Sequence, residues 1–134
     1  MQIGLRVFPA ILSLGIAILT VNAAERPESV TLKSGESVEL GNLFWVVNCR
    51  SLLTGPIVAE VLEAPPEVTV TIREQKVIPR KLDCANEVPG GRLILTASKD
   101  IKERTQGKVT IRLKYPTKDG ERQMSRQLDV TLFP

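Results

Sequence analysis

The sequence predicts an all-β domain, built as two packed antiparallel sheets and preceded by an export signal. Three observations carry this prediction. From Ser29 onward, apolar residues recur at every second position in short runs, which is the period of strands buried on one face. Turn-forming residues separate these runs at intervals of roughly 8–12 residues, a spacing typical of two-sheet sandwiches. Cys49 and Cys84 form one even pair of cysteines.

The N-terminal residues 1–23 have the three parts of a secretory signal peptide. Arg6 provides the positive charge, residues 7–19 form the apolar part, and Val21 and Ala23 stand at the third and first positions before a cleavage site. We expect cleavage after Ala23, with cleavage after Ala24 as the alternative. The alternative is an uncleaved membrane anchor, but the apolar part is shorter than the roughly 20 residues that a spanning helix requires. We therefore expect a cleaved signal and no stable membrane span after cleavage.

Export determines how the two cysteines are interpreted. The mature domain, residues 24–134, is expected in the periplasm or outside the cell, and both are oxidising compartments. The separation of Cys49 from Cys84 is too wide for a CxxC redox motif or a zinc knuckle. We therefore expect a disulfide between them, and closing a loop of this size stabilises a domain by roughly 3–4 kcal/mol.

The first part of the mature chain contains three predicted strands. Alternating apolar residues indicate strands at 30–33 and 37–40, separated by a turn at 34–36. Gly41 and Asn42 are expected to interrupt the chain. The continuous apolar run 43–47 then predicts a strand buried on both faces.

The central part continues the pattern with strands at 57–62 and 68–73. Pro89-Gly90-Gly91 is expected to form a turn that leads into a strand at 92–97. Residues 98–104 are the only part of the mature chain with a helical character. We expect a crossover turn there, with at most one or two turns of helix, ended by Gly107.

The last part of the chain predicts an antiparallel hairpin. Its first strand covers 108–115, and its turn covers 118–121, where Gly120 tolerates the positive φ that such turns require. The apolar side chains that we expect to point inward are Val109, Ile111, Leu113 and Tyr115 on the first strand, and Met124, Leu128, Val130 and Leu132 on the second.

The composition excludes several classes of function. The chain has no histidine, so the commonest general acid-base group and the commonest metal ligand are both missing. The formal net charge of +3 is too small for a nucleic-acid-binding domain. The acidic residues of the predicted loops show no spacing that selects a catalytic pair, and Asp119-Gly120-Glu121 is better explained as a turn than as a calcium site. We predict no catalytic residue, no metal ligand and no cofactor.

Several of these features occur together in one known group of domains. Cys49 follows an early apolar strand, Cys84 precedes the strand that begins near Val88, and the Asp119-Gly120 hairpin is followed by a closing strand at 128–132. In these features residues 28–134 resemble the small secreted bacterial immunoglobulin-like or cadherin-like single domains. The resemblance implies an immunoglobulin-like antiparallel β-sandwich of about seven strands. The strand order stays open, because Trp45 precedes Cys49 instead of following it.

The leading functional hypothesis is a non-catalytic binding or structural module that acts through a protein partner in the cell envelope. Immunoglobulin-like sandwiches offer loops and sheet edges for such binding. Trp45 is expected in the core. The residues that we expect to contact a partner are Leu52 and Leu53 in a predicted loop and Lys108, Arg112 and Lys114 on the outer face of one strand.

Two alternatives stay open. The first is a small enzyme or enzyme inhibitor that acts on polymers of the cell envelope. The second is a protein that binds anionic envelope surfaces. Its basic face would combine Lys108, Arg112 and Lys114 with Arg122 and Arg126 on the paired strand.

Overall fold

The computed structural model of the chain describes residues 28–134, and the predicted signal peptide at 1–23 lies outside them. The described part is all-β, as the sequence predicts, with one three-residue 3₁₀ helix, η1. The elements are β1 (Glu28–Lys33), β2 (Ser37–Leu43), β3 (Val46–Val47), β4 (Arg50–Ser51), β5 (Val58–Glu63), β6 (Val68–Val77), η1 (Arg80–Leu82), β7 (Val88–Ala97), β8 (Thr105–Thr117) and β9 (Gly120–Phe133).

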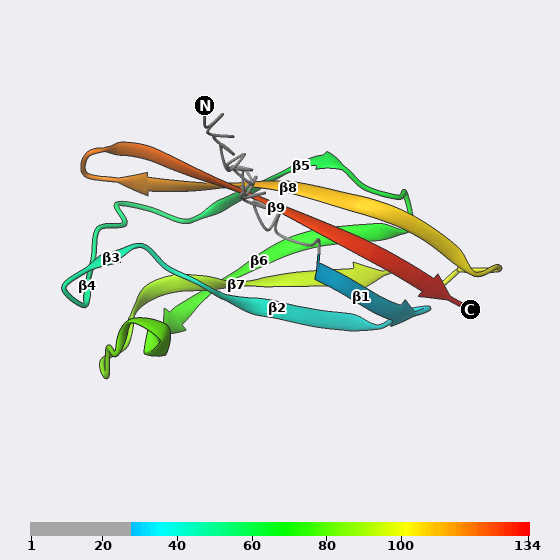
Figure 1. Cartoon of the computed structure of the whole chain (residues 1–134), viewed down its shortest axis with the longest axis horizontal. Coiled ribbons are helices and arrows are strands. Elements are labelled where there is room, and N and C mark those ends of the chain that lie inside the picture. The colour runs from blue at the N-terminus through cyan, green and yellow to red at the C-terminus, as the bar shows by residue number, and fades with distance from the viewer. Residues whose placement is uncertain (1–27) are drawn as a thin grey trace, which may run out of the picture.

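Two main sheets form the domain (Figure 1). The four-stranded sheet has the order β1-β9-β8-β5, and the three-stranded sheet has the order β2-β7-β6. Strands β3 and β4 pair only with each other. All pairings are antiparallel except that of β1 with β9, which runs from Glu28 opposite Leu128 to Lys33 opposite Phe133. Thus the first described strand and the last strand lie side by side.

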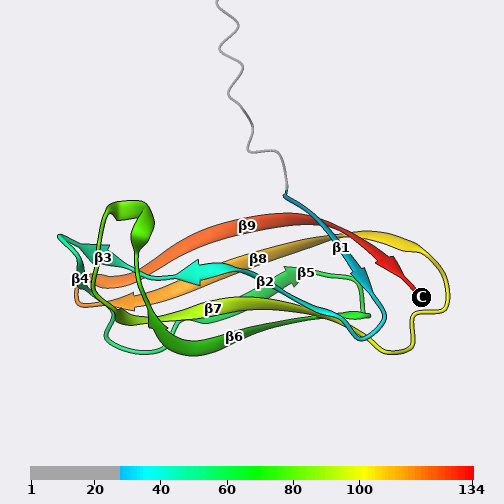
Figure 2. The same cartoon turned by 90° about the horizontal axis from the view of Figure 1, so that it is seen from below.

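The core lies between the two main sheets, which stack as layers (Figure 2). Each sheet contributes alternate side chains to it, as the period-two pattern predicts. Leu32 of β1, Leu95 of β7 and Val109 of β8 are at most 1% exposed. Fully burying such an aliphatic side chain contributes roughly 1.5–3 kcal/mol.

The predicted terminal hairpin is confirmed. Strands β8 and β9 pair without a register shift from Thr105–Leu132 to Thr117–Gly120, and Gly120 has a φ of 107°. The predicted inward side chains are buried except that of Met124, which is 53% exposed. Met124 lies in the first half of β9, and β1 pairs only with the second half, from Leu128 onward.

The prediction for residues 41–47 is wrong in two respects. Gly41 does not interrupt the strand, because β2 continues to Leu43 through a register shift at Gly41, whose φ is 120°. The apolar run is not one buried strand. Leu43 ends β2 in the core, Trp45 belongs to the connection, and Val47 in β3 is 53% exposed.

The predicted turn at Pro89-Gly90-Gly91 is also wrong, because all three residues lie within β7. A Cβ atom on Gly90 would collide with the carbonyl oxygen of Leu43, and one on Gly91 would lie 2.8 Å from Cγ2 of Ile72. The two glycines therefore allow the neighbouring strands β2 and β6 to pack closely against β7.

Residues 98–104 form the predicted crossover, and they do so without any helical turn. The backbone of Ser98 bonds instead to segments distant in the sequence, since its N–H donates to Glu67 and its carbonyl accepts from Gly35. Ile101 is buried in the core. The segment connects β7 in one sheet to β8 in the other, and these contacts hold its backbone in a non-helical path.

The predicted disulfide between Cys49 and Cys84 is present, with a Cα–Cα distance of 5.4 Å. Cys49 lies in the turn between β3 and β4, and Cys84 lies two residues after η1. The bond therefore links the small hairpin to the loop between β6 and β7. The two cysteines are 35 residues apart in the sequence, so the bond substantially reduces the conformational entropy of the unfolded chain.

Candidate interaction surfaces

The two loop leucines predicted to contact a partner are only partly available at the surface. Leu53 packs against the core and forms an isolated bridge with Thr117 of β8. The N–H of Leu52 donates to the carbonyl of Trp45 at 2.9 Å. These contacts fix the loop to the four-stranded sheet, so Leu52 and Leu53 serve first to connect the loop to the core.

The predicted basic residues Lys108, Arg112 and Lys114 do share the outer face of β8, but acidic groups balance them. Glu60 of β5 forms a 2.9 Å ion pair with Lys114 and lies 3.8 Å from Arg112. The hydrogen bond and charge of Lys114 lower the pKa of Glu60 below its ordinary value. Lys108 lies opposite Asp129 in the register of β8 and β9. This face therefore has little net positive charge.

Arg126 and Arg122 do not join this basic face. Their register on β9 directs their side chains to the opposite face of the sheet from Lys108, Arg112 and Lys114. The guanidinium of Arg126 donates to the carbonyl oxygen of Leu40 at 3.1 Å and pairs with Glu28 at 2.6 Å. Arg126 thus connects β9 to β2 and β1 at the side of the domain. The basic surface that the sequence offers as an alternative is therefore not assembled as predicted.

Strand β5 presents a surface that the sequence analysis missed. It is the last strand of the four-stranded sheet, and among the described residues its outer edge has no paired strand. Val58 is 53% exposed, Val61 is 44% exposed and Leu62 is 46% exposed. Exposed apolar side chains are ordinary when scattered but indicate interaction when they gather. The sequence does contain a signal for this surface: apolar residues occupy positions on both faces of the strand in Ile57-Val58-Ala59-Glu60-Val61-Leu62.

The two edges of the three-stranded sheet, β2 and β6, are better protected against strand pairing. In β2 the bulge at Gly41 disrupts the edge, and bulges of this kind discourage further pairing. The edge strand β6 carries Arg73, Glu74 and Lys76 in its second half, and charged side chains have the same effect. β5 also has a register shift, between Val61 and Glu63, so its regular part is Val58–Val61.

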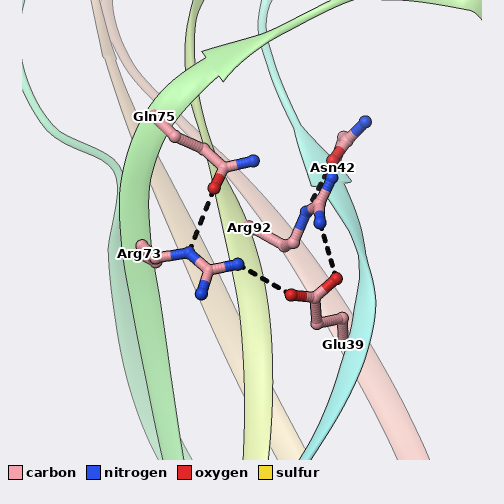
Figure 3. Close-up of polar contacts among 5 residues, drawn as sticks. All are labelled: Glu39, Asn42, Arg73, Gln75 and Arg92. Carbon is pink, nitrogen blue, oxygen red and sulfur yellow. Dashed lines mark hydrogen bonds and ion pairs between the residues drawn. The ribbon is translucent and has the colours of Figure 1, made fainter.

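A polar cluster spans the outer face of the three-stranded sheet (Figure 3). Glu39 of β2 forms ion pairs with Arg73 of β6 at 2.7 Å and with Arg92 of β7 at 2.6 Å. Nε of Arg92 donates to Asn42, and Nε of Arg73 donates to Gln75. The hydrogen bond from Arg73, with a further contribution from Arg92, lowers the pKa of Glu39 below its ordinary value.

A cavity of about 360 Å³ adjoins this cluster at the disulfide end of the domain. Arg92 and Asn42 belong both to the cluster and to the cavity wall. Beyond them, β6 and the loop that contains η1 contribute Lys76, Arg80 and Lys81. The wall of this cavity is therefore rich in basic side chains.

An apolar cavity of about 220 Å³ lies between the segment that precedes β5 and the ends of β6 and β7. Leu53, Pro56 and Ile57 form one wall, so Leu53 does line a hollow although it also packs on the core.

Within residues 28–134, no group of three or more histidine, cysteine, aspartate or glutamate side chains is placed to hold a metal ion. No helix of this described region is long and apolar enough to cross a membrane.

Comparison of the chain with protein-family models, curated proteins and solved structures finds no match.

Proposed function

We propose that the protein is an exported, non-catalytic immunoglobulin-like module that binds a protein partner through the free edge of β5. One observation carries this proposal. Of the six large hydrophobic side chains that are strongly exposed in residues 28–134, three lie on this single six-residue edge strand. Val58 lies opposite Lys114 and Val61 lies opposite Ile111, so their side chains point to opposite faces of the sheet. A partner strand paired along this edge would contact apolar surface on both faces.

Strand addition is the binding mode that suits this edge. The backbone groups of an edge strand that face away from its sheet are free to pair with an extended segment of another protein. At β5 the regular stretch Val58–Val61 would provide those bonds, and Leu62 would add apolar contact at the register shift. Each half-exposed aliphatic side chain contributes about 1 kcal/mol when it is covered. The partner segment is therefore extended and apolar.

Two features support the immunoglobulin-like and export parts of the proposal. The arrangement of four strands over three, with the first strand parallel to the last, suits an immunoglobulin-like sandwich. The Cys49–Cys84 disulfide suits an oxidising compartment, where such bonds persist. The periplasm or the extracellular space is the location that this chemistry favours.

Site-specific photocrosslinking in the producing cell tests the proposal. A photoreactive phenylalanine analogue replaces Val58 in one variant and Met124 in another, because both side chains are 53% exposed but lie on different strands. We expect a discrete crosslinked protein from position 58 that position 124 does not give. The disrupting variant adds Val61→Lys and Leu62→Lys to the position-58 variant, and its crosslink should then be lost.

The fold of each variant is checked by circular dichroism before the crosslinks are compared. A crosslink pattern that is the same from positions 58 and 124, or one that the double lysine change leaves unaltered, would show that β5 is not the binding edge. A product with twice the mass of the chain alone would mean that β5 pairs with a second copy, which also contradicts a distinct protein partner.

A further inference from the structure

The cationic cavity at the disulfide end has an excess of positive charge. Its wall contains four basic side chains, those of Lys76, Arg80, Lys81 and Arg92, against one acidic side chain, that of Glu87. Neutral groups complete the lining, including the amide of Asn42 and the ring of Phe44. A hollow whose wall carries several like charges attracts and retains counter-ions.

Ion pairs within the domain do not neutralise most of this charge. In residues 28–134, Lys76, Arg80 and Lys81 form no ion pair with a carboxylate, whereas Arg112 and Lys114 on the other sheet share Glu60. Arg92 is paired with Glu39, but Arg73 shares that carboxylate. The region therefore keeps a net positive charge at the cavity.

Arg92 is held in place before any ligand arrives. Its Nη1 donates to Glu39 at 2.6 Å and its Nε donates to Asn42 at 3.2 Å (Figure 3). Its Nη2 makes no hydrogen bond with the described residues. A guanidinium fixed in this way loses little conformational freedom when it binds an anion.

The disulfide fixes the opposite wall of the cavity. Arg80 and Lys81 lie in η1, and the backbone N–H of Cys84 returns to the carbonyl of Pro79 at 3.2 Å. Cys84 is only 5% exposed and is bonded to Cys49 in the β3–β4 turn. The loop that carries two of the cations is therefore anchored covalently.

From this arrangement we propose that the cavity binds a tetrahedral oxyanion, with a phosphate group as its ligand. Arginine recognises phosphate oxygens through paired N–H donors, and lysine adds a mobile point charge. Arg80 supplies such a pair of donors, Arg92 supplies its remaining Nη2, and Lys76 and Lys81 supply additional charge. Glu87 opposes the ligand and limits its affinity. The site is separate from the β5 edge and does not depend on the function proposed for that edge.

Titration calorimetry with inorganic phosphate tests the proposal on the full mature domain. The disrupting variant is Arg80→Ala with Lys81→Ala, and the control is Arg112→Ala with Lys114→Ala, which removes the same charge from a face balanced by Glu60. We expect phosphate affinity to fall by about tenfold or more in the first variant, since hydrogen bonds to charged groups are among the strong ones. The control should change it by less than about twofold, because exposed charges at a distance are largely screened.

Two further measurements separate this site from general charge attraction. Glu87→Gln should raise phosphate affinity several-fold, and Val61→Lys with Leu62→Lys should leave it unchanged. Vesicles of phosphatidylglycerol, whose phosphodiester has no balancing cation, are compared with vesicles of phosphatidylcholine, whose phosphodiester is balanced by choline, to show whether the cavity also binds an anionic lipid headgroup. Equal losses of phosphate affinity in the disrupting and control variants, or no measurable binding of phosphate by the unaltered domain, would overturn the proposal.

Discussion

The indole ring of Trp45 packs against the phenol ring of Tyr115, with their centroids 5.1 Å apart and their planes tilted by 50°. These are the only tryptophan and the only tyrosine in the chain. Trp45 lies between β2 and β3, whereas Tyr115 lies near the end of β8. The contact attaches the connection that leads to the disulfide hairpin to the four-stranded sheet, and each residue provides a spectroscopic signal for it.

Replacing Trp45 with alanine should destabilise the domain. Trp45 is partly buried against the core, so we expect Trp45→Ala to reduce the free energy of unfolding by about 2–3 kcal/mol, below the range for a fully buried tryptophan. Urea denaturation followed by circular dichroism measures this change. Val47→Ala, at a side chain 53% exposed, is the control and should stay within about 0.5 kcal/mol. Equal effects of the two changes would mean that Trp45 does not pack on the core.

Tyr115 should make the domain sensitive to alkali. Burial raises the pKa of Tyr115 above its ordinary value of 10.0. Because the folded state then holds the proton more tightly than the unfolded state, this contribution to stability is complete below the unfolded pKa. It is lost as the pH rises from there through the folded pKa. Absorbance at the phenolate band reports this single tyrosine, and it should titrate above the pKa of free tyrosine. In Tyr115→Phe the alkaline loss of stability should be smaller; an unchanged loss would contradict the assignment.

Glu39 should contribute to acid sensitivity. Its hydrogen bonds with Arg73 and Arg92 hold the pKa of Glu39 below its ordinary value of 4.5. The ion pairs therefore stabilise the fold at pH values above the ordinary pKa of 4.5, and they lose this effect as the pH falls through the pKa of Glu39 in the folded state. We expect the melting temperature of the unaltered domain to fall more steeply below that pH than the melting temperature of Glu39→Gln. Glu36→Gln, at a carboxylate outside the described ion pairs, should keep the steeper fall. The effect is small because these side chains are exposed to solvent.

Gly90 should not tolerate a side chain. A Cβ atom there would collide with the carbonyl oxygen of Leu43 and lie 2.8 Å from Cγ2 of Val77. We expect Gly90→Ala to destabilise the domain by about 3 kcal/mol, because the colliding backbone of β2 cannot move without disturbing its pairing. Gly55→Ala is the matched control, since its Cβ would come no closer than 3.7 Å to Pro116. Thermal unfolding should separate the two variants clearly, and similar melting temperatures would contradict the close approach of β2 to β7.

Local patterns in the sequence are sufficient to predict much of the fold. The hairpin of β8 and β9 is predictable because apolar residues alternate on both sides of Asp119-Gly120. The disulfide is predictable because only one pairing of two cysteines exists. By contrast, the parallel pairing of β1 with β9 depends on contacts between the two ends of the domain. No local periodicity encodes such a pairing.

The errors arise where one residue type has two physical uses. The sequence pattern favours a turn at Gly90 and Gly91, but these glycines serve close packing of neighbouring strands. The apolar residues of β5 are typical of a core strand, but the strand lies at a sheet edge and leaves Val58 exposed. Alternation places Arg112 and Lys114 on the correct face, yet the acid that balances them comes from another strand.

The exported, disulfide-braced state is the central claim, and the intact mass of the protein recovered from outside the cytoplasm tests it most directly. The protein is treated with an alkylating reagent with and without reductant. We predict the mass of a chain that begins at Ala24 or Glu25. It should carry no alkyl group before reduction and two after reduction, at Cys49 and Cys84. The mass of a chain that begins at Met1 and carries two alkyl groups before reduction would contradict the exported, disulfide-braced state.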